Sequence, residues 1–405
     1  MRVAMTGYGA VTSLGSGVED LWSGMIEGRS GVCELGEVDD LWRDLPVRIA
    51  APVTVDLEAD LGRVRMRQLD RNAQLALVAT AEAWGDAGRP EPDPDRLAVV
   101  IGTGIGGVQT LLEQDDTLES RGPRRVSPRS VPMLMPNAAS AQISIEYGAR
   151  AGTFTTASAC ASGAEAIAMG ARLIRDDDAD VVIAGGVEAA ITALTMAGFA
   201  QAQALAKPDG AADELSRPFD RERRGFVLGE GSGIVILESE AHAAARGAHV
   251  HAWLAGWGVT SDAYHITGAD PDGGGQVRAM RKALSLGGLG AADVGHVNAH
   301  ATGTTIGDRA EANAIFQVFG EDVNVTGPKG ALGHLVGGAG AVEAIITART
   351  IETGIVPATR NLREVDPDIH LDIVSVAPRH TPVDAAVSNS FGFGGQNVTL
   401  MLHAA

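Results

Sequence analysis

The segment "TTASACASGAEAIAMGARLI" (155–174) places Cys160 in a nest of small residues just ahead of a run with helical spacing of its apolar positions. The helical part, "GAEAIAMGARLI" (163–174), returns later in the chain as "GAVEAIITARTI" (340–351). One such match between Ala-rich and Gly-rich runs is weak evidence. It nevertheless suggests that the chain is duplicated, with Cys160 at the start of the first copy of this helix.

Four further segments recur in the same order, and five matches in order predict two similar halves, residues 1–248 and 249–405. The other matched pairs are "GYGAVTS" (7–13) with "GWGVTS" (256–261), "QLALVATAEAWGDAG" (74–88) with "QVRAMRKALSLGGL" (276–289), "RLAVVIGTGIGG" (96–107) with "VGHVNAHATGT" (294–304), and "GFVLGEGSGIVILE" (225–238) with "GFGGQNVTLMLH" (392–403). Two copies this long are not a solenoid, whose repeats are far shorter.

The alternation of strand-like and helical runs predicts α/β layers. The strand runs "AVVIG" (98–102) and "VVIAGG" (181–186) are apolar throughout, which is typical of strands buried on both faces. No Pro/Ser/Gly-rich linker separates the two halves. We therefore expect the halves to pack tightly against each other.

Composition excludes several classes of protein. The chain has 405 residues, 45% of them apolar, and a formal net charge of −19, which disfavours nucleic-acid binding. No apolar run approaches the roughly 20 residues of a membrane helix, and the N-terminus does not resemble a signal peptide. With only two cysteines, Cys33 and Cys160, we expect a cytoplasmic protein with free thiols.

Two arginine-rich windows run against the acidic composition, "GRVRMRQLDR" (62–71) and "RGPRRVSPR" (121–129). They are either solvated basic faces or a docking surface for an acidic partner. The arginines that we single out in them are Arg65, Arg67, Arg71, Arg124, Arg125 and Arg129.

Cys160 is either a small buried apolar residue, as most cysteines are, or a nucleophile. A cysteine at a helix N-terminus faces unpaired backbone N–H groups and the positive end of the helix dipole. These features lower the pKa of a thiol below its free value of roughly 8.5. The small neighbours leave room for a substrate.

Two histidines offer the proton donor or acceptor that thiol chemistry needs. His300 ends the strand-like run "VNAHATGT" (297–304), and His334 lies in the Gly-rich loop "GPKGALGHLVGGAG" (327–340), five residues after Lys329. The turn in "SNSFGFGGQN" (388–397) exposes backbone N–H groups that could form an oxyanion hole, although it could equally be a hairpin turn. This constellation fits a cysteine hydrolase as well as an acyl-transferring enzyme.

The order and spacing of the motifs resemble the β-ketoacyl-acyl-carrier-protein synthases of the thiolase superfamily, in their elongating type II (FabF-like) branch. The resemblance covers nearly the whole chain and rests on "RVAMTGYGAVTSLG", "SACASGAEA", "SRPFDRERRGFVLGEGSG", "VNAHATGTTIGDRAEANAI", "PKGALGHLVGGAGAVEA" and "NSFGFGGQN". It implies a duplicated αβαβα layered sandwich and a decarboxylative Claisen condensation of an enzyme-bound acyl chain with a malonyl thioester. It also implies a dimer.

The resemblance implies a role for each matching residue. Cys160 would carry the acyl chain, His300 and His334 would assist decarboxylation and stabilise the enolate, and Lys329 would support the His334 side of the site. The remaining implied residues are Cys160 and Phe393 for the oxyanion hole, Thr302 and Thr304 for the phosphopantetheine arm, Ile105 and Phe199 for the acyl pocket, Glu343 as a buried acid, and "PMLMPN" (132–137) as a segment reaching into the partner's pocket. The six arginines would dock the acyl carrier protein.

Related activities are separated by single features. A degradative thiolase would need a second cysteine in "FGFGGQN", and a non-catalytic chain-length factor would lack the cysteine nucleophile. A type II polyketide ketosynthase, working with a chain-length-factor subunit, stays open as the alternative. The reaction implied needs no metal and no organic cofactor, and the partners implied are acyl carrier protein and either a second copy or a homologous subunit.

Overall fold

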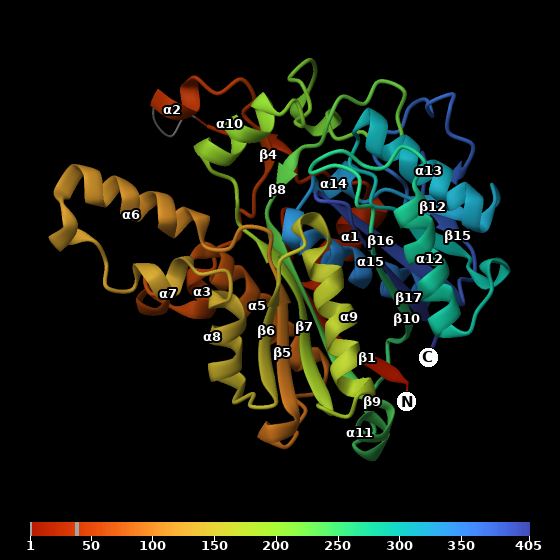
Figure 1. The fold of residues 1–405 in the computed structure, drawn as a ribbon, viewed down its shortest axis with the longest axis horizontal. Coiled ribbons are helices and arrows are strands. Elements are labelled where there is room, and N and C mark those ends of the chain that lie inside the picture. Colours follow the sequence, from red (N-terminus) through yellow and green to blue (C-terminus); the bar gives the residue numbers. More distant parts are fainter. Residues whose placement is uncertain (1, 37–39) are drawn as a thin grey trace.

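The computed structural model describes residues 2–36 and 40–405, and these residues form one large mixed sheet with helices on both faces (Figure 1). The strands of the large sheet are β1 (Val3–Thr12), β2 (Gly15–Ser16), β5 (Leu97–Gly102), β6 (Gly152–Thr156), β7 (Val181–Glu188), β9 (Gly231–Ser239), β10 (Ala252–Ser261), β11 (His296–Asn298), β12 (Asn324–Thr326), β14 (Asp372–Ile373), β16 (Ala385–Gly392) and β17 (Gln396–His403). The shorter strands outside it are β3 (Cys33–Glu34), β4 (Ile49–Ala51), β8 (Leu228–Gly229), β13 (Ile355–Val356) and β15 (Arg379–His380).

The helices divide into those that cover the sheet and shorter ones in the connections. The α-helices are α1 (Val18–Glu27), α2 (Asp40–Arg43), α3 (Glu58–Leu61), α4 (Arg63–Met66), α5 (Arg71–Asp86), α6 (Val108–Arg121), α7 (Ser130–Leu134), α8 (Ala138–Tyr147), α9 (Ser162–Arg175), α10 (Ala193–Gln201), α11 (Glu240–Ala245), α12 (Gly274–Gly287), α13 (Thr305–Phe319), α14 (Lys329–Leu332) and α15 (Ala339–Thr353). Short 3₁₀ turns precede α9 (Ala159–Ala161), α7 (Pro123–Arg125) and α15 (Val336–Gly338).

The sheet is built from two matching series of strands. They meet at β1 and β10, which pair antiparallel over only three residues each, Val3–Met5 and Ala252–Leu254. On one side of this joint the order is β9, β7, β5, β6, and on the other it is β17, β16, β11, β12. In both series each of the first two strands pairs antiparallel with the strand before it, counting outward from the joint. Each of the last two strands pairs in parallel with the strand before it. The division of the chain between residues 248 and 249 stays a prediction.

The helices complete five layers. Helices α5 and α8 cover the outer face of the first strand series, and α12 and α13 cover the outer face of the second. Helices α9 and α15 lie between the two series and contact both (Figure 1). The predicted duplicated αβαβα sandwich is therefore confirmed.

The apolar strands are buried on both faces, as their sequences predicted. Along β7, Val181 and Ile183 belong to the core shared with α5, whereas Val182 and Ala184 belong to the core shared with α9. Successive side chains of a strand point to opposite faces, so a strand between two helical layers needs apolar residues at every position. Within the described residues, no helix is both long enough and apolar enough to span a membrane.

One close approach brings the two halves together beside Cys160. A Cβ atom placed on Gly163, in the first turn of α9, would lie only 2.8 Å from the carbonyl oxygen of Gly337. Glycine at position 163 therefore permits the start of α9 to contact the turn that precedes α15. The catalytic candidates of both halves consequently share one region.

An ionic cluster around His251 also links the two halves. His251, in the connection to β10, lies with Nδ1 2.6 Å from Glu352 Oε1 of α15 and with Nε2 2.9 Å from Asp86 Oδ2 of α5. Two carboxylate acceptors require an N–H on both ring nitrogens, so the ring is an imidazolium. Burial by itself lowers the pKa of His251, but the hydrogen bonds to Asp86 and Glu352 outweigh burial and raise it to about 9.

This cluster makes stability depend on pH in the alkaline range. Because the pKa of His251 is higher in the folded chain than its ordinary value of 6.5, its contribution is complete below pH 6.5 and disappears as the pH rises through about 9. We expect the free energy of unfolding to fall across this window. His251→Gln should flatten that dependence in urea titrations, while His370→Gln, a control outside the cluster, should leave it unchanged. Equal pH dependence in wild type and His251→Gln would contradict the assignment.

Candidate active site

A cavity of about 440 Å³ opens between the two halves and is lined by residues from both. It brings together eight residues that the sequence singled out. They are Ile105, Cys160, Phe199, His300, Thr302, Thr304, His334 and Phe393. Candidates separated by up to 288 positions in the chain thus share one pocket.

Cys160 lies in the 3₁₀ turn that leads into α9, as the sequence predicted for a helix start, and it is only 9% exposed. Ala159 before it has φ 51°, a left-handed conformation that costs a non-glycine residue about 1–3 kcal/mol. The backbone N–H groups of Phe393 and Cys160 act to lower the pKa of the thiol group. A Cβ on Gly392 would lie 3.0 Å from the nitrogen of Cys160, so glycine lets the 392–395 turn come this close.

The expected lowering of the Cys160 pKa is wrong. Burial raises the pKa of the thiol to about 11, although the N–H groups of Phe393 and Cys160 and the charge of Lys329 act in the opposite direction. The helix start was correctly placed, but desolvation of the thiolate outweighs the favourable backbone groups. The thiol is therefore protonated at neutral pH and must lose its proton as it reacts.

His300 and His334 face the thiol. One ring nitrogen of each histidine and the Cys160 sulfur all lie within 4.8 Å of one another. The two imidazole rings are 5.3 Å apart and nearly perpendicular. Burial, together with the charge of Lys329, holds the pKa of both histidines well below the ordinary value, so both are neutral at physiological pH. Within the described part of the chain neither nitrogen of His334 has a hydrogen-bond partner, which leaves it available to a substrate.

Lys329 lies beside His300, and its charge acts on the pKa of both His300 and His334. Its Nζ atom is 3.4 Å from His300 Nδ1 and forms an ion pair with Glu343. Both Lys329 and Glu343 are almost completely buried, so the ion pair places a positive charge directly behind the histidines.

The comparisons with known proteins agree with this geometry. Residues 1–243 match the model of the β-ketoacyl synthase N-terminal domain and residues 251–363 that of the C-terminal domain. The chain belongs to the β-ketoacyl synthase family. It is 42% identical over 404 residues to the 3-oxoacyl-[acyl-carrier-protein] synthase 2 of Mycobacterium bovis, covering 98% of this chain and 96% of that protein.

Two solved structures share the fold over the full length of this β-ketoacyl synthase. The ishigamide ketosynthase/chain length factor superposes with a TM-score of 0.92 at 32% identity, covering 100% of this chain and 99% of that one. A ketosynthase complex containing a type II PKS acyl-carrier protein and a bound hexaketide, AntDE:AntF, also superposes with a TM-score of 0.92, at 29% identity and the same coverage.

The pocket of this synthase has a polar and an apolar side. Thr302 and Thr304 approach each other to 3.1 Å through their hydroxyl groups. On the apolar side Phe199 packs edge-on against Phe226, with ring centroids 5.3 Å apart, and Ile105 is partly exposed in the wall. This division suits a polar carrier arm on one side and an apolar chain on the other.

Two buried acids at the site were not found from the sequence. The carboxylate of Glu311 accepts hydrogen bonds from the backbone N–H groups of His300 (2.8 Å) and Ala301 (2.7 Å), so it fixes the position of the His300 backbone. Glu188 similarly accepts backbone hydrogen bonds near Cys160. The available signal was the occurrence of an acid inside an otherwise apolar run, as in "GGVEAA" (185–190).

The six arginines of the two basic windows differ in their surroundings. Arg65 forms an ion pair with Glu146, and Arg71 binds the buried Glu230 and the carbonyl oxygen of Val53. Arg71 is therefore better explained as a structural residue than as a docking residue. The others are exposed, namely Arg67, Arg124, Arg125 and Arg129.

Two groups among the described residues have ligand atoms close enough to hold a metal ion. One is the set of Cys160, His300 and His334, where the Lys329 ammonium next to His300 opposes a cation. The other is His249, His251 and Glu352, where His251 already holds a proton on each nitrogen and so has no lone pair to offer. Neither set is well suited to a metal ion, because an ammonium group lies next to the first and His251 of the second is protonated on both nitrogens.

Proposed function

We propose that this chain is an elongating β-ketoacyl-acyl-carrier-protein synthase, which condenses a Cys160-bound acyl chain with a malonyl thioester carried by acyl carrier protein. The single observation that carries the proposal is the clustering of the Cys160 sulfur and one nitrogen each of His300 and His334 within 4.8 Å at a pocket. The names of its relatives, such as the synthase of Mycobacterium bovis, support the same reaction.

The first half-reaction transfers the acyl group. The Cys160 sulfur attacks the thioester carbonyl, its proton passes to the phosphopantetheine sulfur that leaves, and Cys160 becomes a thioester. The oxyanion that forms accepts hydrogen bonds from the N–H groups of Cys160 and Phe393. Because the pKa of the thiol is raised to about 11, proton transfer has to accompany this attack, and an imidazole at this distance can relay the proton.

The second half-reaction forms the carbon–carbon bond. The malonyl carboxylate leaves as CO₂, and its electron pair becomes the enolate of the remaining acetyl thioester. Neutral His300 and His334 donate hydrogen bonds to the enolate oxygen, with the charge of Lys329 behind His300. The enolate carbon then attacks the Cys160 thioester, and the cysteine sulfur leaves and recovers a proton. We propose that no metal or organic cofactor takes part and that the enzyme is cytoplasmic.

A condensation assay tests the proposal. Purified protein, acyl carrier protein loaded with an acyl chain, and malonyl-loaded carrier should release one CO₂ for each β-ketoacyl product. Mass spectrometry of the carrier arm should show the chain extended by two carbons and a keto group. Hydrolysis of the acyl thioester with no extended product would indicate a cysteine hydrolase instead.

A type II polyketide ketosynthase is the second candidate. It is favoured by the full-length similarity to the ishigamide ketosynthase/chain length factor and to the ketosynthase solved with its hexaketide. The neighbouring genes distinguish the two candidates. A gene next to this one that encodes a second, cysteine-less homologous chain would favour polyketide synthesis. A neighbouring set of reductase and dehydratase genes would favour fatty-acid elongation.

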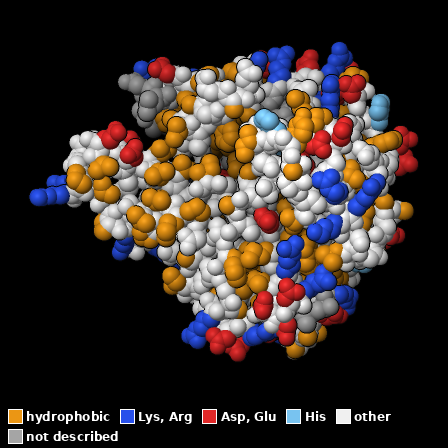
Figure 2. All heavy atoms as spheres, in the orientation of Figure 1, with side chains coloured by type: hydrophobic (Ala, Val, Ile, Leu, Met, Phe, Trp, Pro, Cys, Tyr) orange, Lys and Arg blue, Asp and Glu red, His pale blue; other side chains and the backbone are white. Residues whose placement is uncertain are grey.

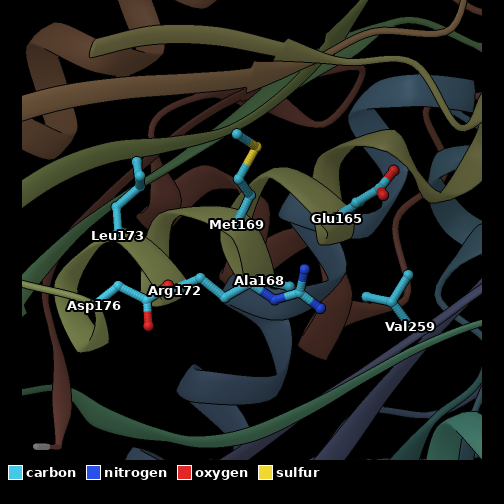
Figure 3. Close-up of a pocket in the computed structure, with 7 residues that line it drawn as sticks. All are labelled: Glu165, Ala168, Met169, Arg172, Leu173, Asp176 and Val259. Carbon is cyan, nitrogen blue, oxygen red and sulfur yellow. The ribbon is translucent and has the colours of Figure 1, made fainter. Parts of the chain in front are cut away.

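We also propose that the protein is a dimer, with itself or with a homologous subunit. Strand β6 is an edge of the large sheet and exposes unpaired backbone groups, which favours pairing with another chain. Met169 and Leu173 of α9 and Val259 of β10 line a further pocket, together with the charged residues Glu165, Arg172 and Asp176 (Figure 3). Hydrophobic side chains also gather on the projecting α6 and the segment next to it (Figure 2). The exposed ones include Met135 of the predicted partner-reaching segment 132–137 and Val131 just before that segment.

Light scattering tests the dimer. At micromolar concentration we expect twice the mass of the chain, because the exposed apolar residues and the open sheet edge are costly to leave in water. Leu173→Asp, on the α9 face, should shift the protein toward monomer. Leu286→Asp, on the outer helix α12, should not. A monomeric wild-type protein would refute the homodimer, and a monomer that persists on co-expression with a homologous subunit would refute the heterodimer.

We propose that an acidic carrier protein docks on the basic windows. The long-range charge of −19 opposes this, but screening over roughly 8 Å at physiological salt leaves a docked carrier to respond mainly to nearby charges. Arg124, Arg125 and Arg129 follow the outer end of α6, where Lys and Arg side chains are visible in Figure 2. Arg65 contributes less freely because Glu146 already pairs with it.

Charge reversal at Arg125 should raise KM for acyl carrier protein several-fold and leave turnover of small acyl-pantetheine thioesters nearly intact, since rim charges act mainly on association. Arg65→Glu should do the same more weakly. Arg281→Glu, on the exposed surface of α12, is the matched control and should change neither substrate. If Arg125→Glu slows both substrates equally, Arg125 acts on the pocket or on folding and the docking proposal is wrong.

A further inference from the structure

Glu188 ends strand β7 next to the thiol site, and its carboxylate is fully buried. Four donors converge on it. They are the backbone N–H groups of Gly104 (2.7 Å), Ile105 (3.3 Å) and Gly337 (3.2 Å), and the hydroxyl group of Thr103 (3.1 Å). No described lysine, arginine or histidine forms an ion pair with it, so three backbone N–H groups and one hydroxyl group stabilise its charge.

The donors come from two loops that belong to different halves. Residues 103–106 follow β5 and include Ile105 of the apolar pocket wall, whereas Gly337 lies in the turn that follows His334. Gly104 and Gly337 are themselves packed together, since a Cβ on Gly337 would lie 2.5 Å from the nitrogen of Gly104. One carboxylate therefore holds both loops around the sulfur.

We infer that Glu188 is a positioning residue of the thiol site, which fixes the acyl-pocket loop at 103–106 and the histidine loop at 336–338 relative to Cys160. The expected effect of Glu188 on catalysis rests on the proposed function. Its expected effect on the reactivity of Cys160 does not, because an alkylating reagent measures that reactivity directly.

Glu188 affects its surroundings through its charge as well as through its hydrogen bonds. It raises the pKa of Cys160, whereas Lys329, a further charged group near the thiol, lowers it. Just before the neighbouring strand β9, Glu230 precedes Gly231, the register partner of Glu188, but Glu230 is paired with Arg71. Burial raises the pKa of Glu188 itself to about 7, against the hydrogen bonds from the three N–H groups and Thr103.

Glu188→Gln tests the inference because it keeps the shape and replaces one acceptor oxygen with an N–H₂ group that opposes the backbone donors. We expect kcat for condensation to fall by about 10- to 100-fold, since small displacements of reacting groups have effects of this size. KM for acyl carrier protein should change by less than about 3-fold, because docking is remote from this buried residue. Glu82→Gln removes a partly buried carboxylate that accepts two backbone N–H groups and does not line the cavity around the thiol, and it should leave kcat within about 2-fold.

Alkylation of Cys160 by iodoacetamide gives a readout that needs no condensation activity. In a Cys33→Ser background, which removes the exposed second thiol, Glu188→Gln should alkylate about 3- to 10-fold faster at pH 8, because loss of the negative charge favours the thiolate. Glu188→Asp keeps the charge and shortens the side chain. It should slow condensation while its alkylation rate stays near that of the wild type, which a general loosening of the site would not do.

Two results would overturn the inference: a kcat for Glu188→Gln within about 2-fold of wild type, or equal acceleration of alkylation in the Gln and Asp variants. If the Glu188 variants do not fold, Thr103→Val, which removes one donor, should reduce kcat while Thr103→Ser restores it, and equal rates would again overturn the inference. If Cys160 of the wild-type protein is alkylated as expected but the protein never catalyses condensation, the proposed function is refuted. The alkylation rates of the variants would then still decide whether Glu188 positions the thiol site.

Discussion

Cys160→Ala is expected to abolish condensation, with a loss of at least about 10⁴-fold, as is typical when a covalent nucleophile is removed. No other described cysteine can replace it, because Cys33 is exposed on strand β3 and does not line the pocket. The measurement is the rate of β-ketoacyl product formation from acyl-loaded and malonyl-loaded carrier. Cys33→Ala is the matched control and should retain full activity.

A second substitution at the same position separates the two half-reactions. Cys160→Gln cannot form a thioester, but its amide fills the space of an acylated cysteine and leaves His300 and His334 in place. We expect it to retain decarboxylation of the malonyl thioester without condensation. Loss of decarboxylation in Cys160→Gln in a folded protein would show that the sulfur, and not the histidine pair, is needed to generate the carbanion.

His300→Ala and His334→Ala should each reduce condensation by more than about 100-fold, because each removes a hydrogen-bond donor to the developing enolate from a site that excludes water. Both rings are neutral at physiological pH, so each has one N–H group that can donate a hydrogen bond without carrying a charge. The effect should lie mainly on kcat. His403→Ala, at the end of β17 outside the pocket, should behave as wild type.

The histidine variants also test the role of Lys329. Since Lys329 lies beside His300, Lys329→Met should resemble His300→Ala more closely than His334→Ala in its loss of malonyl decarboxylation. Near-normal turnover in either histidine variant would make that histidine structural. Intact circular dichroism spectra of both variants are needed to attribute the loss to the site.

The fold was predictable because the two halves repeat similar sequence segments in the same order. The recurrence of "GAEAIAMGARLI" (163–174) as "GAVEAIITARTI" (340–351) corresponds to α9 and α15, the two helices of the middle layer. The matched segments 7–13 and 256–261 fall largely in β1 and β10, which pair with each other at the joint of the sheet through Val3–Met5 and Ala252–Leu254. Local pattern and order sufficed here, since each repeated element has the same neighbours in both halves.

The positions of Cys160, His300 and His334 were predictable, but their environment was not. The sequence places the thiol at a helix start, which lowers its pKa, while the opposing effect of burial depends on the packing of both halves around it. The contact of Lys329 with His300, 29 positions earlier in the chain, likewise depends on the tertiary fold.

Long-range pairing explains the remaining differences. Arg71 looked like an exposed basic residue at a helix start, but it binds Glu230, 159 positions away. Glu188 sits in an apolar strand with no charged neighbour in sequence, and its donors lie at residues 103–105 and 337. The acid inside this apolar run is a local signal, but the partners of Glu188 and Arg71 follow only from the tertiary fold.

The most direct test of the account is to find where the acyl group is attached. The protein is incubated with acyl-loaded carrier protein in the absence of malonyl carrier, quenched in acid, digested and analysed by mass spectrometry. The account predicts the acyl mass on the peptide containing Cys160, removable by hydroxylamine as a thioester and absent from Cys160→Ala. Label on Cys33 alone, or none on Cys160 while condensation proceeds, would contradict it.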